Sequence, residues 1–278
     1  MIKEYLFCAT SIFALIYLNT AYAQFPNATI DTVIPMPVTQ AVEDGRRQLE
    51  LSGNSQNLAA GYGHWNDVVL RGMYKSSSHL LQSEISINRR FEKKGVFIGI
   101  GDTYIFNDDW FGSLSFGAGD GAFYLPKYRV DASLSKKWLE KRNLVTSLGT
   151  GLYKAPDGHV DRNISTGAAY YFDMPLILEG GIRFNNSSPG SIKTQQQFLA
   201  LTYGKDKQDY ITVRHGWGAE GYLSIAANSQ LVNFKNRETS ISWRHWLDLK
   251  TGIIVGANDY ANPLYKRVGV NIGIFRDF

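Results

Sequence analysis

Histidine and serine side chains are the groups in this sequence that could carry out hydrolytic chemistry. The five histidines are His64, His79, His159, His215 and His245. No two of them have the H-x-x-x-H spacing that places two imidazoles on one metal ion. Ser240 and Ser242 stand close to His245, so a serine nucleophile activated by a histidine across neighbouring strands is one hypothesis. Because both residue types are common in strands, a chance arrangement is the simpler interpretation, and we predict no catalytic residue, metal or cofactor.

Six charged residues occupy a different kind of position, inside segments in which every second residue is apolar. They are Glu84, Arg90, Glu179, Arg183, Arg214 and Arg244. A basic side chain at the middle of a bilayer costs roughly 2–4 kcal/mol, so strands that cross a membrane would turn these residues inward. We predict that they line a lumen. There they either stiffen the interior through ion pairs or form a polar path for a solute or a glycan.

The elements that must position these residues are strands, because the segments alternate with a period of two. In residues 176–184, Leu178 and Ile182 share one face of a strand, while Glu179 and Arg183 share the other. Segments of about ten alternating residues, separated by turn clusters, follow one another to the end of the chain without a helical interruption. This pattern predicts an all-β fold, a transmembrane antiparallel up-and-down β-barrel of about 14 strands, with 12 as the alternative.

Two kinds of connection separate these strands. The short ones are residues 107–109, 139–143, 173–175, 205–208 and 246–248. The others, mostly longer and richer in Gly, Pro and Asn, are residues 120–127, 155–160, 186–191, 218–233 and 259–264. Because bacterial outer-membrane barrels have short periplasmic turns and longer external loops, this alternation predicts that both termini are periplasmic.

The first residues of the chain indicate secretion. A basic start with Lys3, an apolar core over residues 6–18 and an Ala-Tyr-Ala site ending at Ala23 predict a signal peptide that is cleaved after Ala23. The only cysteine, Cys8, lies within this peptide, so the mature chain folds without a disulfide. The proline-containing residues 24–46 are expected to form an extended periplasmic tail, followed by the barrel over residues 47–278.

The composition is rich in aromatic residues and low in charge. Aromatics reach 13%, charged residues 19% and the net charge is +4, too mild and dispersed for a nucleic-acid-binding face. We predict an aromatic girdle at the two edges of the bilayer, formed by Trp65, Trp110, Trp138, Trp217 and Trp246. The terminal Phe278 is expected to act as the insertion signal for the barrel-insertion machinery, although Arg276 departs from the usual apolar residue near that end.

A family resemblance rests on the order of several segments. Residues 215–218 (His-Gly-Trp-Gly), residues 243–246 (Trp-Arg-His-Trp), the strand from Gly252 to Tyr260 and the final strand resemble the YaiO family of outer-membrane β-barrel proteins. The resemblance implies a single barrel domain in the outer membrane of a Gram-negative bacterium. It supplies no catalytic residue, and it suggests a link to exopolysaccharide or other envelope functions.

The resulting hypothesis is a non-enzymatic barrel that forms a narrow pore or an accessory port for envelope or exopolysaccharide transport. One alternative is an enzyme that modifies lipid or lipopolysaccharide, either a lipid hydrolase or an acyltransferase. Another is a structural docking barrel without conductance. The expected partners are outer-membrane lipid, lipopolysaccharide and the barrel-insertion machinery, with a polysaccharide or a periplasmic protein as a further partner and no nucleic acid.

Overall fold

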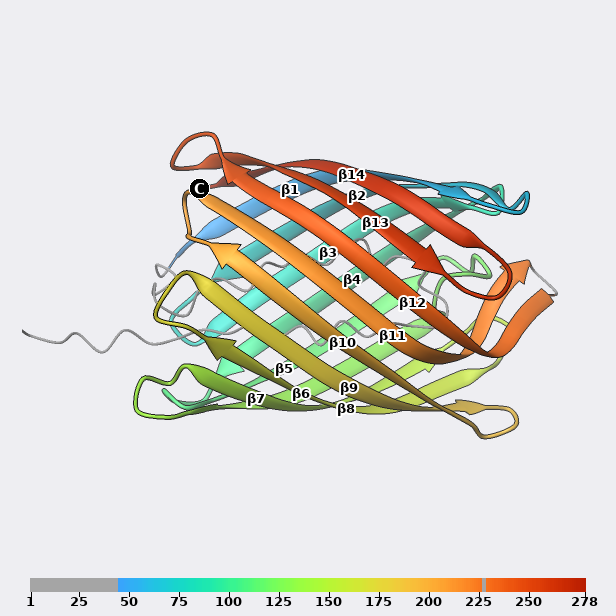
Figure 1. The fold of residues 1–278 in the computed structure, drawn as a ribbon, viewed down its shortest axis with the longest axis horizontal. Coiled ribbons are helices and arrows are strands. Elements are labelled where there is room, and N and C mark those ends of the chain that lie inside the picture. The colour runs from blue at the N-terminus through green and yellow to red at the C-terminus, as the bar shows by residue number, and fades with distance from the viewer. Residues whose placement is uncertain (1–44, 227–228) are drawn as a thin grey trace, which may run out of the picture.

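The computed structural model describes residues 45–226 and 229–278. They form one closed antiparallel sheet of fourteen strands (Figure 1). The strands are β1 (Arg47–Leu58), β2 (Gly63–Lys75), β3 (His79–Arg90), β4 (Lys93–Ile105), β5 (Trp110–Gly119), β6 (Tyr128–Trp138), β7 (Leu144–Lys154), β8 (Val160–Tyr171), β9 (Leu176–Ser188), β10 (Ile192–Gly204), β11 (Asp209–Ala226), β12 (Ser229–Trp246), β13 (Thr251–Ala261) and β14 (Lys266–Asp277). No described segment is a helix long and apolar enough to cross a membrane.

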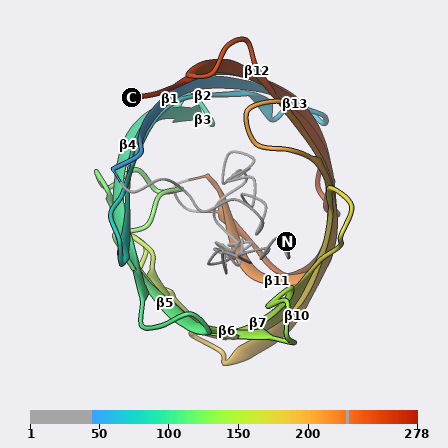
Figure 2. The same ribbon diagram turned by 90° about the vertical axis from the view of Figure 1, so that its left-hand side faces the viewer.

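The sheet closes because the first strand pairs with the last. β1 and β14 are antiparallel neighbours, from Gln48 opposite Asp277 to Leu58 opposite Arg267. Every other strand pairs with its neighbours in sequence, which confirms the predicted up-and-down topology. Closure leaves no strand edge unpaired, and the barrel is seen end-on in Figure 2.

The alternation of side chains confirms which face each strand presents. On β14 the apolar residues Val268, Val270, Ile272 and Ile274 are exposed on the outer wall. The residues of opposite orientation on the same strand include Arg267, Asn271 and Phe275, which are buried inside the barrel. β-Branched side chains thus cover the outside, whereas glycine, polar and some aromatic residues fill the inside.

The connections between strands lie at the two ends of the barrel. We call the end where β1 begins and β14 ends the terminal end. Its turns are residues 76–78, 106–109, 139–143, 172–175, 205–208 and 247–250. At the opposite end, which we call the loop end, the connections include residues 59–62, 91–92, 120–127, 155–159, 189–191 and 262–265. The prediction of mostly longer connections at this end is wrong for three segments, because strands continue into them. β9 continues to Ser188, β11 and β12 pair as far as Ala226 with an irregularity after Ser224, and β13 continues to Ala261.

The longest departure from the wall is the far part of the β11–β12 hairpin, residues 221–226 and 229–233, which we call the cap hairpin. Its strands remain paired to Ala226 opposite Ser229. In the end-on view the far part of β11 lies across the opening (Figure 2). Tyr222 and Leu223 are buried there. A Cβ atom on Gly221 would collide with the Ser187 side chain, so glycine permits this close approach to β9.

Candidate functional site

Alternation places all six predicted lumen residues on the inward face. Arg90 on β3, Arg183 on β9 and Arg244 on β12 are buried. The other three, Glu84, Glu179 and Arg214, alternate with exposed apolar neighbours such as Ile85, Leu178 and Val213. The barrel does not bring the six residues into one site. Glu84 and Arg244 belong to a network at one end and Arg90 to a cluster at the other, while Glu179 and Arg214 flank Ala200 on β10.

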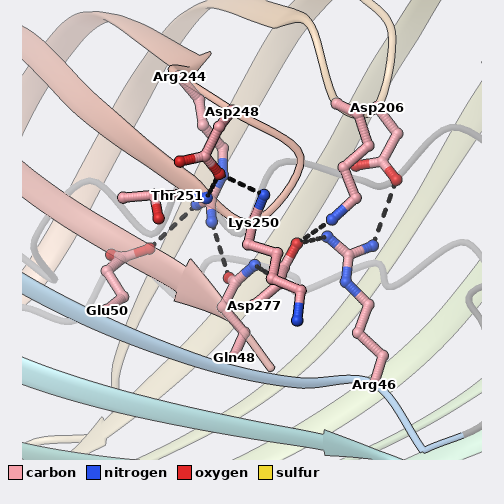
Figure 3. A network of polar contacts seen from close by, with 10 residues as sticks. Arg46, Gln48, Glu50, Asp206, Arg244, Asp248, Lys250, Thr251 and Asp277 are labelled. Carbon is pink, nitrogen blue, oxygen red and sulfur yellow. Dashed lines mark hydrogen bonds and ion pairs between the residues drawn. The ribbon is translucent and has the colours of Figure 1, made fainter.

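A network of charged groups crosses the terminal end, as Figure 3 shows. Asp277 at the end of β14 accepts hydrogen bonds from Arg46 at 2.8 Å and from Gln48 at 2.6 Å. Its carboxylate also pairs with Lys207 in the β10–β11 turn. Arg46 reaches a second carboxylate in that turn, because its guanidinium lies 3.3 Å from Asp206. The turn is thereby held against the junction between the first and last strands.

The same network continues along the inner wall of β1, β2 and β3. Arg244 donates to Glu50 at 3.0 Å and to Gln48 at 2.7 Å. Arg71 then joins Glu50 at 3.2 Å to Glu84 at 2.9 Å. We call the set Arg46, Gln48, Glu50, Arg71, Glu84, Asp206, Lys207, Arg244 and Asp277 the terminal network. Charge is balanced locally within it, as buried ions require.

Figure 3 also shows how the neighbouring β12–β13 turn is fixed. The Asp248 carboxylate accepts hydrogen bonds from the backbone N–H groups of Lys250 and Thr251, each at 2.7 Å. These two bonds favour the charged carboxylate and hold the pKa of Asp248 below its usual range. The turn therefore contributes a fixed negative charge at the rim of the terminal end.

A second group of charges lies at the loop end around one indole ring. Trp65 is completely buried, with the guanidinium carbons of Arg90 and Arg267 at 5.3 and 5.0 Å from its ring. Arg90 pairs with Asp67 at 3.3 Å, and Arg267 pairs with Glu238 at 3.3 Å. Sequence reasoning did not select Asp67, Glu238 or Arg267, although the alternation in β2, β12 and β14 already placed them on the inward face.

Two of the five predicted girdle tryptophans are inside the barrel, which corrects the prediction for them. Trp65 is 0% exposed, and Trp246 is 5% exposed in a cluster with Tyr210, Ile254 and Phe275. Their closeness to turns suggested a bilayer edge. Residues two apart on a strand point to the same face, however, so Trp246 points inward with Arg244 on β12. The outer wall instead carries Trp110, Trp138, Trp217 and, not predicted, Trp243.

The cap hairpin contacts opposite parts of the wall. The Tyr222 hydroxyl donates to the Pro189 carbonyl at 2.7 Å, and its ring stacks on His159 with 5.0 Å between centroids. Gln230 hydrogen-bonds Asp157. Leu223 belongs to a buried cluster with Leu58 of β1, Trp65 of β2, Phe234 of β12, Tyr260 of β13 and Tyr265 of the β13–β14 turn. The hairpin is thus held between the β8–β10 side and the β1–β2 side of the barrel.

The loop 120–127 adds a further inward contact beside the cap hairpin. Tyr124 donates to the backbone carbonyls of Asn88 and Lys93, each at 3.0 Å. The Arg90 guanidinium lies 5.6 Å from the Tyr124 ring. Burial raises the pKa of Tyr124 to about 12. This loop and the cap hairpin together narrow the loop end with aromatic side chains.

The YaiO membrane β-barrel domain matches residues 46–223, more than half of the chain. The chain belongs to the YaiO family. No curated protein matches this YaiO barrel significantly.

Several solved outer-membrane barrels share the YaiO barrel's fold at low sequence identity. The CymD monoaromatic hydrocarbon channel is 7% identical, with a TM-score of 0.59 over 85% of this chain and 89% of that chain. A bacterial polysaccharide outer-membrane secretin is 10% identical, with a TM-score of 0.55 over 84% and 98%. Omp33 of Acinetobacter baumannii is 12% identical, with a TM-score of 0.51 over 84% and 100%. These likenesses establish the fold only.

The geometry of the YaiO barrel separates the serines and histidines of the hydrolase hypothesis. Ser240 and Ser242 are buried on the inward face of β12, whereas His215 and His245 point outward. The nearest hydroxyl to His215 is that of Thr239 at 2.8 Å, and His245 Nδ1 lies 2.7 Å from Asp209. Neither histidine can activate either serine from the opposite face of a strand.

The remaining predicted position is at the end of the chain. Phe278 follows β14, is exposed, and donates its backbone N–H to the Arg47 carbonyl at 2.9 Å. The guanidinium of Arg276 lies 5.8 Å from its ring on the same outward side. Among residues 45–226 and 229–278, no group of three His, Cys, Asp or Glu side chains is placed to hold a metal ion.

Proposed function

We propose that this YaiO-family barrel is a narrow pore of the outer membrane whose loop end is closed at rest by the cap hairpin. The observation that carries the proposal is the position of Tyr222 and Leu223, which are buried between opposite sides of the wall. Behind them the inward face is polar, with the terminal network at its far end. A barrel that only anchors itself in lipid does not need a paired hairpin folded across its own opening.

The proposed orientation places both termini in the periplasm and the loop end outside. The predicted signal peptide, cleaved after Ala23, would deliver the chain across the inner membrane, but residues 1–44 lie outside the described structure. The same holds for most of the proposed periplasmic tail, residues 24–46. Phe278, at the terminal end, is proposed as the signal that the barrel-insertion machinery binds. The loop 120–127 and the cap hairpin, which extend furthest from the wall, both leave the loop end, and this favours the external side for that end.

The proposed solute is a saccharide, as in a port for envelope or exopolysaccharide transport. Support comes from the inner surface at the loop end, which the cap hairpin covers in the closed state and would uncover on opening. There Trp65 and Tyr260 lie beside Asn258 and Glu238. Aromatic faces next to amide and carboxylate groups suit a ligand that presents C–H faces and hydroxyl groups together. Arg183, Glu179 and Arg214 are proposed to line the path between this region and the terminal network.

Liposome swelling with sugars of increasing size tests this proposal. The test uses a variant in which an Asn-Gly turn replaces the cap hairpin, residues 221–233. Glu220 and Phe234 are directly paired, so they can flank a two-residue turn. Liposomes with this capless variant should swell in disaccharide much faster than those with the native barrel. Equal swelling rates for the two proteins and for protein-free liposomes would contradict a pore.

The second candidate function is a docking barrel that conducts nothing. The terminal network favours it, because paired charges fill the interior at that end and stiffen the wall. A capless variant that remains impermeable to every sugar and ion would support docking over transport. No observation favours the lipid-modifying enzyme, since the candidate serines and histidines face opposite sides.

A further inference from the structure

The outer wall carries unpaired basic residues at the loop end, directly beyond the apolar band. Arg89 on β3 lies opposite Lys94 on β4 and opposite Asn66 on β2. All three are exposed, and each points outward because its neighbours along the strand are on the inward face. We call Asn66, Arg89 and Lys94 the β2–β4 row.

A similar row lies on another part of the wall. Asn186 on β9 is opposite Arg162 on β8 and opposite Lys193 on β10. These three residues are also exposed and outward-facing, and we call them the β8–β10 row. Each row thus combines two cations and one amide on three adjacent strands. Neighbouring strands lie about 4.8 Å apart, so a single headgroup can reach a whole row.

Both rows border the part of the wall that contacts lipid tails. Ile87 and Val96 follow Arg89 and Lys94 toward the middle of the barrel, and Ile164 follows Arg162. These apolar residues are exposed on the outer wall. The charges therefore stand at the height of lipid headgroups, where basic side chains are attracted to anionic lipid.

The cations of these rows have no carboxylate partner among the described residues. No ion pair is formed by Arg89, Lys94, Arg162 or Lys193, and Glu92 in the adjacent turn pairs with none of them. Like charges directly opposite each other across two strands destabilise a sheet unless an anion lies between them. The Arg89–Lys94 pair therefore favours an anion from outside the protein.

The opposite rim of the outer wall is different. At the terminal end the outward cations lie on aromatic rings, with Lys136 at 3.8 Å from Trp138 and Arg47 at 5.5 Å from Tyr74. His79 pairs with Asp102 there at 2.7 Å. These rim residues have partners within the protein, unlike the cations of the two rows.

We propose that the two rows bind the phosphorylated saccharide headgroup of lipopolysaccharide in the outer leaflet, an inference that rests on the proposed orientation with the loop end outside. Arginine and lysine bind phosphate through charge-assisted hydrogen bonds, and the asparagine amide can bind a sugar hydroxyl. Glycerophospholipid supplies one phosphate and no sugar ring, so it fits a row of two cations and an amide less well. The surface lies on the outside of the wall and is separate from the proposed solute path.

Binding of rough-type lipopolysaccharide to the purified mature barrel in neutral detergent tests the proposal. The double variants R89Q/K94Q and R162Q/K193Q each remove two cations from one row, and R47Q/K136Q removes two cations from the terminal rim as a matched control. Because the rows are separate surfaces, each row variant should bind about half as much lipopolysaccharide as the native protein, and the variant that combines all four substitutions should bind roughly tenfold or more weakly. R89K/K94R, which conserves charge, should bind like the native protein.

Several results would overturn the proposal. They are an undiminished amount of bound lipopolysaccharide in both row variants and in the combined variant, an equal loss in R47Q/K136Q, undiminished binding of dephosphorylated lipopolysaccharide, and equally tight binding of phosphatidylglycerol micelles. Heat-modifiable migration in gels shows that each variant is folded. Because the two rows lie on different strands, each variant tests the proposal by itself if the other does not fold.

Discussion

Arg244 on β12 and Glu50 on β1 are joined by a hydrogen bond of 3.0 Å inside the barrel, although β13 and β14 lie between their strands. Both side chains are largely buried, and the Arg244 guanidinium carbon also lies 3.6 Å from the centre of the Phe275 ring. This contact connects the last hairpins with the first strand across the inner wall. It supports the junction at which the sheet closes.

Removing one partner of this pair should destabilise the barrel strongly. Arg244→Ala leaves the Glu50 carboxylate with Arg71 alone and opens space over Phe275, so we expect a loss of about 3–5 kcal/mol in the free energy of unfolding. Urea unfolding of refolded protein in lipid vesicles measures the loss. Arg276→Ala, on the outer face of β14, is the control and should change stability by about 0.5 kcal/mol or less. Equal effects of the two variants would contradict a role for the pair.

Loosening the cap hairpin should increase conductance without unfolding the wall. Tyr222→Ala removes the hydrogen bond to Pro189 and the stack on His159, which hold the hairpin against the β8–β10 side. We expect longer or more frequent open states in planar bilayers. Tyr203→Ala, which removes an exposed ring from the outer wall, should leave the open time unchanged. A Tyr222→Ala barrel with native gating would show that these contacts do not close the pore.

Charge inside the lumen should set ion selectivity. Arg183→Ala removes an inward cation from the proposed path, so the pore should become more permeable to cations relative to anions. The reversal potential in a salt gradient measures this shift. Arg276→Ala removes an outward cation from the outer face of β14 and should not move the reversal potential. Identical shifts from both variants would indicate a surface-charge effect rather than a lumen effect.

Tyr124 should titrate at unusually high pH. Burial raises its folded-state pKa to about 12, above the ordinary value of 10.0. Its protonated form is favoured by the fold, so this contribution to stability is complete below pH 10 and is lost as pH rises toward 12. The difference in ultraviolet absorbance between the native barrel and Tyr124→Phe should therefore have a midpoint near pH 12. A midpoint near pH 10 would show that the loop 120–127 leaves Tyr124 in water.

The wall of the barrel could be predicted from sequence because apolar and inward-facing residues alternate one by one along each strand. Val268 to Ile274 alternate without a break, and this fixes which side faces lipid. The same parity rule would have placed Trp246 inside with Arg244. Nearness to a turn suggested the opposite, because the ends of strands meet both lipid and lumen.

The interior could not be predicted in the same way. Two ion pairs illustrate this: Arg267 with Glu238, and Arg244 with Glu50. Both depend on the register and curvature of strands that are distant in sequence. For the cap hairpin, the glycines at 216, 218 and 221 predict a connection over residues 218–233, and a loop hairpin over residues 221–234 is an alternative that the sequence leaves open. Pairing of β11 with β12 continues past these glycines, and a hairpin results.

Single-channel conductance of the native barrel and the capless variant, measured side by side in planar bilayers, tests the central claim most directly. The account predicts small or rare conductance steps for the native protein and large, persistent steps for the variant that lacks residues 221–233. Both proteins must show the same heat-modifiable migration, so that the difference reports the opening and not the wall. Indistinguishable conductance of the two barrels would contradict a pore that is closed by this hairpin.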